Sequence, residues 1–80
     1  MKIQVTRKHI KAGKMGRMTL CPIALALKER GFENVKITTE TVEVDGAELT
    51  LSPSEAKFVD DFDSGKPVKP FVLHLRFAQA

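Results

Sequence analysis

Hydrophobic and polar residues alternate at both ends of the chain, which is the pattern of half-buried β-strands. Ile3 and Val5 lie on one face of a short strand predicted over residues 1–6. Near the other end, a run rich in apolar and β-branched residues predicts a strand in an inner position of the sheet. Its apolar stripe, at every second position, consists of Phe71, Leu73, Leu75 and Phe77.

The segment after the first strand carries the signals of a short helix. Thr6 stands at the N-cap position, and an apolar pair on either side of it has the spacing of a hydrophobic staple. Gly13 provides a residue that readily adopts the left-handed conformation with which such helices end. We therefore predict a helix over residues 7–12, followed by a glycine-containing loop over residues 14–20.

Two further helices have proline at their first position, where the missing N–H costs no hydrogen bond. Cys21 precedes Pro22 and is the expected N-cap of a helix over residues 22–30, which ends at Gly31. This helix is apolar on all sides and should be buried. Residues 52–55, with the sequence Ser-Pro-Ser-Glu, form a capping box that opens a third helix.

The pair Asp45-Gly46 predicts a β-hairpin, because a type I′ turn requires positive φ at both of its central residues. A change of parity among the apolar residues predicts a break near residues 38–41, between this hairpin and the strand before it. The turn places two pairs of apolar residues opposite each other on one face: Val44 with Ala47, and Val42 with Leu49.

The elements follow one another in the order β-α-α-β-β-(β)-α-β within 80 residues. This order favours an α+β fold, in which a small antiparallel or mixed sheet carries helices mainly on one face. A chain of this length should form one domain, residues 1–80, that buries about 60–65% of its unfolded surface. Such a domain has room for one surface site or shallow pocket, and a large enzyme architecture is excluded.

The charge is distributed unevenly along the chain, although the net charge is only +3. Residues 1–28 contain seven Lys and Arg and no Asp or Glu, whereas residues 29–64 contain ten acidic residues against three basic ones. A disordered basic arm would lack the apolar residues that are interleaved with these cations. We therefore expect a folded domain with a basic face.

The basic residues converge on the start of the second helix. Arg7 and Lys11 share one edge of the first helix, and Lys14 and Arg17 follow in the loop that leads to Cys21. The free N–H groups at a helix N-terminus favour anions, so the arrangement predicts a site for a small phosphorylated ligand. A solvated basic face that balances the acidic half of the chain is the alternative. The predicted ligand-binding residues are Arg7, Lys8, Lys11, Lys14, Arg17, Cys21 and Ile23.

Enzymatic chemistry is not expected, and neither is a cofactor. Cys21 at a helix N-cap could be a reactive thiolate, but catalysis would also require a base, and only His9 and His74 are available. A small buried structural cysteine is the favoured interpretation. One cysteine and two histidines without a close-spaced pair do not make a zinc site, so we predict neither catalytic nor metal-binding residues.

Three segments carry a resemblance to known sequences: residues 9–13 (HIKAG), residues 21–27 (CPIALAL) and residues 62–71 (FDSGKPVKPF). Together with the Val-rich hairpin, they resemble a family of small proteins of tailed bacteriophages and prophages. The resemblance covers most of the chain. It implies a phage accessory protein that acts in the cytoplasm of an infected bacterium, and it assigns no catalytic residue. The single cysteine and the absence of a long apolar run agree with a cytoplasmic location.

Three functions remain open at this stage. The first is binding of a small phosphorylated ligand, of which sequestration of a nucleotide immune signal of the host is one form. The second is inhibition of a host factor by direct protein binding, which an exposed apolar patch beside the basic face would favour. The third is nucleic-acid binding without sequence specificity, which the pI of about 9.3 supports and the absence of Trp and Tyr opposes.

Overall fold

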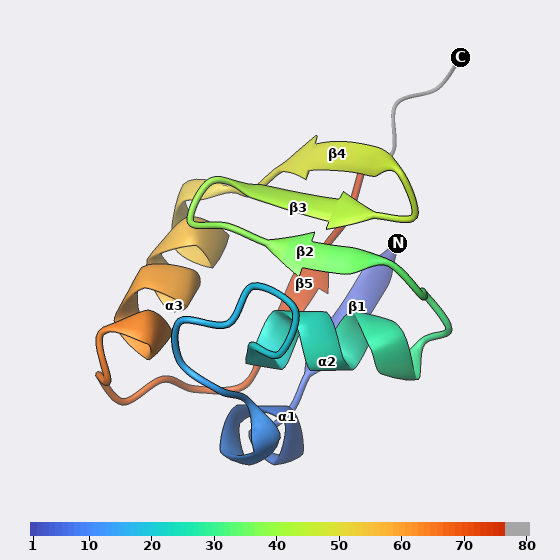
Figure 1. Cartoon of the computed structure of the whole chain (residues 1–80). Helices are drawn as coiled ribbons and strands as arrows, with labels where there is room; N and C mark the ends of the chain where they lie inside the picture. The colour runs from blue at the N-terminus through green and yellow to red at the C-terminus, as the bar shows by residue number, and fades with distance from the viewer. Residues whose placement is uncertain (77–80) are drawn as a thin grey trace.

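A computed structural model describes residues 1–76, which form three helices and five strands in the predicted order (Figure 1). The elements are β1 (Lys2–Val5), α1 (Arg7–Ala12), α2 (Pro22–Glu29), β2 (Val35–Ile37), β3 (Thr41–Val44), β4 (Ala47–Thr50), α3 (Pro53–Asp63) and β5 (Phe71–His74). None of the helices described is long and apolar enough to cross a membrane.

The strands form two small antiparallel sheets, which confirms the α+β class. One sheet pairs β1 with β5, with Ile3 opposite Leu73, and the other has the order β2-β3-β4. The three-stranded sheet lies above α2 in Figure 1, and the β1–β5 ribbon lies behind it. The division into two sheets differs from the single sheet expected from the sequence.

The prediction of an inner position for the last strand is wrong. Within residues 1–76, β5 pairs with β1 alone. The outer side of β5 is occupied by a helix side chain, because the backbone N–H of His74 donates to Oε2 of Glu55 at 3.0 Å. That contact takes the place of a neighbouring strand. Phe77, the last residue of the predicted stripe, lies outside the described residues.

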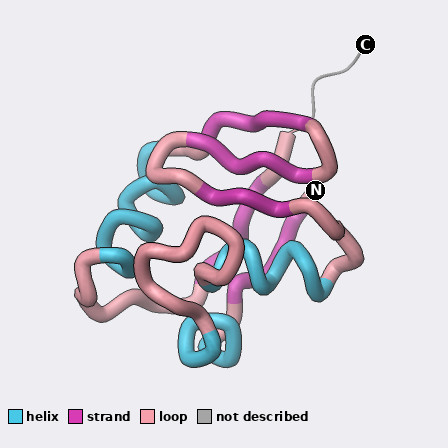
Figure 2. The backbone as a smooth tube through the Cα atoms, in the orientation of Figure 1, coloured by secondary structure: helices cyan, strands magenta, loops and turns pink. Residues whose placement is uncertain are grey.

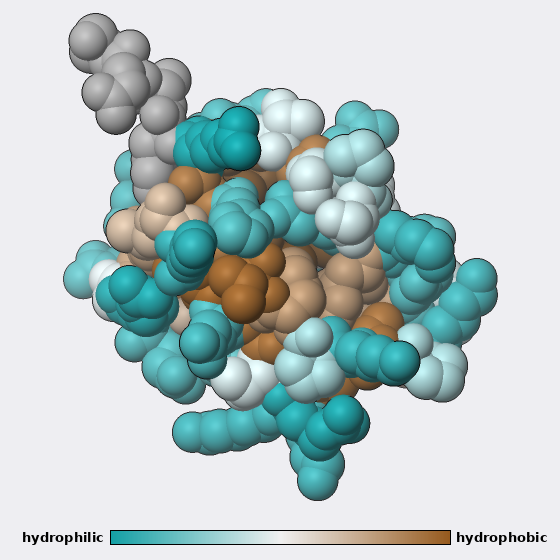
Figure 3. Space-filling model, turned by 180° about the vertical axis from the view of Figure 1, so that it is seen from behind, coloured by the Kyte–Doolittle hydropathy of each residue, from teal (hydrophilic) through white to brown (hydrophobic). Residues whose placement is uncertain are grey.

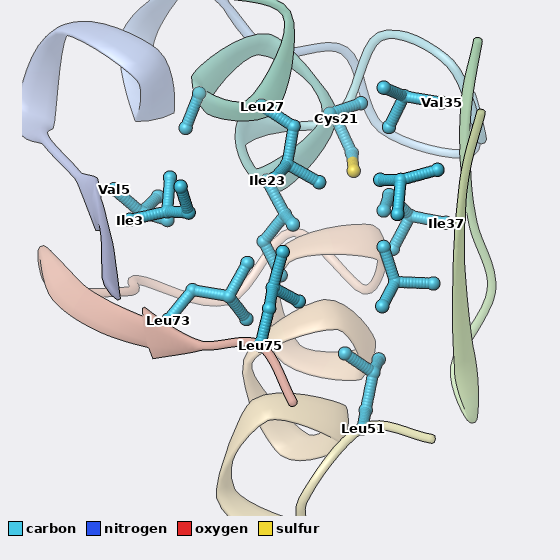
Figure 4. Close-up of a cluster of buried hydrophobic side chains, with 14 of the residues drawn as sticks. Ile3, Val5, Cys21, Ile23, Leu27, Val35, Ile37, Leu51, Leu73 and Leu75 are labelled. Carbon is cyan, nitrogen blue, oxygen red and sulfur yellow. The ribbon is translucent and has the colours of Figure 1, made fainter. Parts of the chain in front are cut away.

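The core lies between the two sheets and α2 (Figure 4). Ile23 and Leu27 project from α2 and are fully buried. The sheets contribute the alternate residues that the sequence pattern had assigned to their inner faces. The buried strand residues are Ile3, Val5, Val35, Ile37, Val42, Val44 and Leu73.

The Asp45-Gly46 turn has the predicted conformation and register. Asp45 has φ 45° and Gly46 has φ 90°, as a type I′ turn requires. Val44 lies opposite Ala47, and Val42 lies opposite Leu49. The break near residues 38–41 is a second tight turn, which joins β2 to β3.

Two helix ends illustrate different uses of glycine. Gly31 has φ 102° and ends α2, and the N–H of Phe32 donates to the Leu27 carbonyl, which is the Schellman pattern. Gly13 ends α1 with φ −68°, so the predicted left-handed conformation is wrong. Gly13 is needed there for space, since a Cβ atom on it would lie 2.7 Å from Cδ of Pro22.

Candidate functional site

The loop between α1 and α2 is anchored to three parts of the fold. The N–H of Ile37 donates to the Met18 carbonyl at 2.8 Å, which ties the loop to β2. The N–H of Gly16 donates to Oδ1 of Asp63 at the end of α3. Lys28 of α2 donates through Nζ to the Thr19 carbonyl at 2.6 Å. The loop, drawn in pink in front of α2 in Figure 2, is therefore held in one place from several sides.

The five predicted cations of α1 and this loop are all exposed to solvent. Within residues 1–76, none of them lies within ion-pair distance of a carboxylate. The sequence around them contains no Asp or Glu before Glu29. These cations are Arg7, Lys8, Lys11, Lys14 and Arg17. They lie along residues 7–18, a stretch called the basic segment below, and the carboxylate nearest to its backbone is that of Asp63, which accepts the N–H of Gly16.

The other two predicted site residues lie in the core. Cys21 is 4% exposed and Ile23 is 0% exposed, and both are labelled among the buried side chains of Figure 4. The residues between and after them, Pro22 and Ala24, are buried as well. The first turn of α2 is thus covered on all sides, because its apolar side chains pack inward and Gly13 packs onto Pro22.

The structure therefore does not bring the seven predicted residues together. Five are on the surface and two are enclosed, so a ligand at the basic segment would not reach the N-terminus of α2 in this arrangement. An anion-binding role for the set stays a prediction. The apolar residues 21–27 predict the helix correctly. The same residues also bury its N-terminus, which makes this end inaccessible as a binding site.

Burial also decides the chemistry of Cys21. It raises the pKa of the thiol above its ordinary value, and the nearby backbone N–H groups of Ala24 and Ile23 only partly oppose this effect. A thiol of this kind is protonated at neutral pH and is a poor nucleophile.

Two methionines of the basic segment lie on the surface. Met15 is 59% exposed and Met18 is 48% exposed, and Arg17 stands between them. Exposed side chains of this size are pliable apolar contacts. Residue type alone could not distinguish them from core-filling methionines. Their separation from any apolar periodicity, in a loop with two glycines and two cations, is the signal that points to the surface.

The buried residue His9 has a structural role. Its Nδ1 accepts the backbone N–H of Thr6 at 3.0 Å, as a Glu or Gln side chain does in a capping box. Because a backbone N–H can only donate, the proton of the neutral imidazole resides on Nε2, which donates to Oε2 of Glu29 at 3.1 Å. His9 thus joins the start of α1 to the end of α2.

Comparison with known protein families, with curated proteins and with solved structures finds no match for this chain. Among residues 1–76, no three His, Cys, Asp or Glu side chains are grouped so that they could hold a metal ion.

Proposed function

We propose that this protein binds a partner protein through its basic segment, residues 7–18. The five cations would face acidic residues of the partner, and Met15 and Met18 would supply the apolar contacts. The observation that carries the proposal is the exposure of both methionines beside unpaired cations on an anchored loop. Methionine and arginine are enriched in protein interfaces and lysine is depleted, so Met15, Met18 and Arg17 are the expected centre of the contact.

The same observation separates this function from binding of a small phosphorylated ligand. Phosphate groups interact with cations and backbone N–H groups and gain little from thioethers. The N-terminus of α2, which a phosphate site would need, is enclosed, because Cys21 to Ala24 are buried and Gly13 packs against Pro22. A protein surface, in contrast, makes use of both the charge and the apolar side chains.

The basic segment also suits a nucleic acid less well than it suits a protein partner. Single-stranded nucleic acids need exposed aromatic side chains on which bases can stack. Among residues 1–76, every phenylalanine is buried or half-buried. Phe58 and Phe71 contact each other at a ring-centroid distance of 4.5 Å.

The sequence resemblance to phage accessory proteins supplies a setting for the proposal. In that setting the partner is a protein of the bacterial host with an acidic surface, and the phage protein acts as its inhibitor. Electrostatic attraction would accelerate the encounter, and the methionines would contribute to the lifetime of the complex.

The experiment is a quantitative affinity purification from bacterial extract with matched variants. The wild type should enrich a partner that the double variant Met15→Ala/Met18→Ala, which leaves the charge unchanged, fails to retain. The control is Val72→Ala, which truncates an apolar residue of 41% exposure on β5. It should retain the partner.

The charge variant Lys14→Glu/Arg17→Glu completes the design, and it should also lose the partner. If the methionine variant retains every protein that the wild type enriches, the proposal is wrong. Binding of nucleotides or duplex DNA that depends on the cations and is indifferent to the methionines would identify a phosphate-binding surface instead.

A further inference from the structure

A separate surface hollow of about 390 Å³ lies between β1, α1 and α2, and the groups that line it distinguish it from other hollows of similar size. It belongs to the part of the molecule where the β1–β5 ribbon runs behind α2 (Figure 1). From behind, an apolar area is visible in the middle of the surface with hydrophilic side chains around it (Figure 3). The residues that line the hollow are Lys2, Gln4, Thr6, His9, Ala26, Glu29, Arg30 and Val72.

Two cations line this hollow, and one of them is held in position. Nη1 of Arg30 donates to the backbone carbonyl of Lys2 at 3.1 Å. This bond orients the guanidinium and uses one of its five donors. Within the described chain, neither Arg30 nor Lys2 forms an ion pair with a carboxylate. Both positive charges are therefore available to a ligand.

The hollow also contains an oriented acceptor. Oε2 of Glu29 accepts from Nε2 of His9, and His9 is itself held by the N–H of Thr6. A carboxylate has two oxygens with about four acceptor positions, so Glu29 can accept further hydrogen bonds while this one persists. The hollow thus presents two cations and a carboxylate acceptor beside the exposed apolar side chain of Val72.

We infer that this hollow binds a small phosphate monoester that carries neighbouring hydroxyl groups, the chemistry shared by sugar phosphates and nucleoside monophosphates. A phosphate monoester has a charge near −2 at neutral pH and would pair with Lys2 and Arg30, on the side of the hollow away from the carboxylate of Glu29. The planar fork of an arginine suits phosphate oxygens. A hydroxyl beside the phosphate would donate to Glu29, as sugar hydroxyls donate to carboxylates in nucleotide-binding folds.

This inference does not depend on the proposed protein partner. The hollow shares no lining residue with the basic segment except His9, whose side chain faces α2. The exposed cations of that segment can consequently be changed without altering the hollow. Lys2 and Arg30 of the hollow can likewise be changed without altering the basic segment.

The test is a titration with ribose 5-phosphate, followed by amide chemical shifts of the isotopically labelled protein. Binding with a Kd of about 1 mM or tighter is expected, with shifts confined to residues 2–6 and 26–30 and to His9 and Val72. Lys2→Ala and Arg30→Gln should each weaken binding about tenfold, since each removes a charge-assisted contact. Lys14→Ala/Arg17→Ala should leave the affinity unchanged.

Two further measurements make the test specific. Ribose 5-phosphate should bind more tightly than inorganic phosphate, and Glu29→Ala should remove that difference. The dispersion of the amide spectrum reports whether each variant is folded. If Arg30→Gln is not folded, the affinity of Lys2→Ala tests the inference on its own. The inference is overturned if no shifts occur at about 10 mM ligand. It is also overturned if the shifts map to residues 11–18 or if Lys14→Ala/Arg17→Ala weakens binding as much as Lys2→Ala.

Discussion

Glu55 accepts the backbone N–H of His74 through Oε2 at 3.0 Å and the backbone N–H of Ser52 through Oε1 at 2.9 Å. A single carboxylate, 6% exposed, therefore caps its own helix and occupies the outer side of β5. The hydrogen bond to His74 occupies one position on the outer side of β5, where a further strand would otherwise pair.

Replacing Glu55 should destabilise the fold markedly. Glu55→Ala leaves two backbone N–H groups without their partner, and the free energy of unfolding should fall by about 2–4 kcal/mol. Urea denaturation measures this change. Glu40→Ala, an exposed glutamate in the turn before β3, is the control and should change the stability by less than about 0.5 kcal/mol. A loss equally small for Glu55→Ala would show that the carboxylate is not structural.

The opposed glutamates of the hairpin should be a point of weakness. Glu43 on β3 lies directly opposite Glu48 on β4 on the exposed face. Like charges in this position repel, so Glu48→Lys should raise the free energy of unfolding by about 0.5 kcal/mol, and less at high salt. Glu33→Lys makes the same change of charge outside the strands. An equal gain from both variants would indicate an effect of net charge alone.

Cys21 should contribute through packing and through its protonation state. Because burial raises the pKa of the thiol in the folded protein, the folded state retains the proton at pH values where an unfolded thiol, with a pKa of about 8.5, loses it. The resulting stability is fully present below pH ~8.5 and is lost as the pH rises toward the folded pKa. Cys21→Ser should remove this pH dependence, which denaturation curves at several pH values can detect.

The same variant should remain folded at neutral pH. Serine is a good N-cap residue. Cys21 makes no side-chain capping hydrogen bond, whereas a serine hydroxyl can accept a backbone N–H from the first turn of α2. The opposing cost of enclosing a hydroxyl keeps the expected change below about 2 kcal/mol. The native thiol should resist alkylation at neutral pH except through unfolding. Rapid alkylation of the folded protein would contradict the buried, protonated thiol.

Charge reversal in the basic segment should abolish partner binding without unfolding the protein. Lys11 and Arg17 are exposed and make no ion pair within residues 1–76. Arg17→Glu and Lys11→Glu should therefore leave the unfolding free energy within about 0.5 kcal/mol of wild type. Lys69→Glu is the control, because Lys69 is exposed in the loop before β5 and makes no ion pair within the described residues; this variant should retain the partner. A large loss of stability would mean that the cations serve the fold.

The local parts of the fold follow from residues that are close in the chain. The Ser52–Glu55 capping box and the Asp45-Gly46 turn depend on contacts over two or three residues, and both have the predicted form. The alternation of apolar and polar residues likewise predicts the inner faces of the strands, because it depends only on residues that are close in the chain. The division into two sheets involves residues far apart in the chain, such as Glu55 and His74, whose hydrogen bond no local pattern reveals.

The candidate site was predictable only in part. The run of cations without acids showed where the charge would be, and all five lie on the surface. The solvent accessibility of the N-terminus of α2 depends on how the loop before it packs. Gly13 packs directly against Pro22 and helps to enclose this end of the helix. The exposure of Met15 and Met18 likewise depends on the anchoring of their loop to β2 and α3.

The three methionines offer the most direct test of the proposed protein interface. Met1, Met15 and Met18 are all about half exposed, but Met1 lies beside β5, where its amino group donates to the Leu75 carbonyl. In protein labelled at the methionine methyl groups, addition of the partner recovered by affinity purification should shift or broaden the Met15 and Met18 signals and leave Met1 unchanged. Unchanged Met15 and Met18 signals at saturation, or equal changes at Met1, would contradict the account.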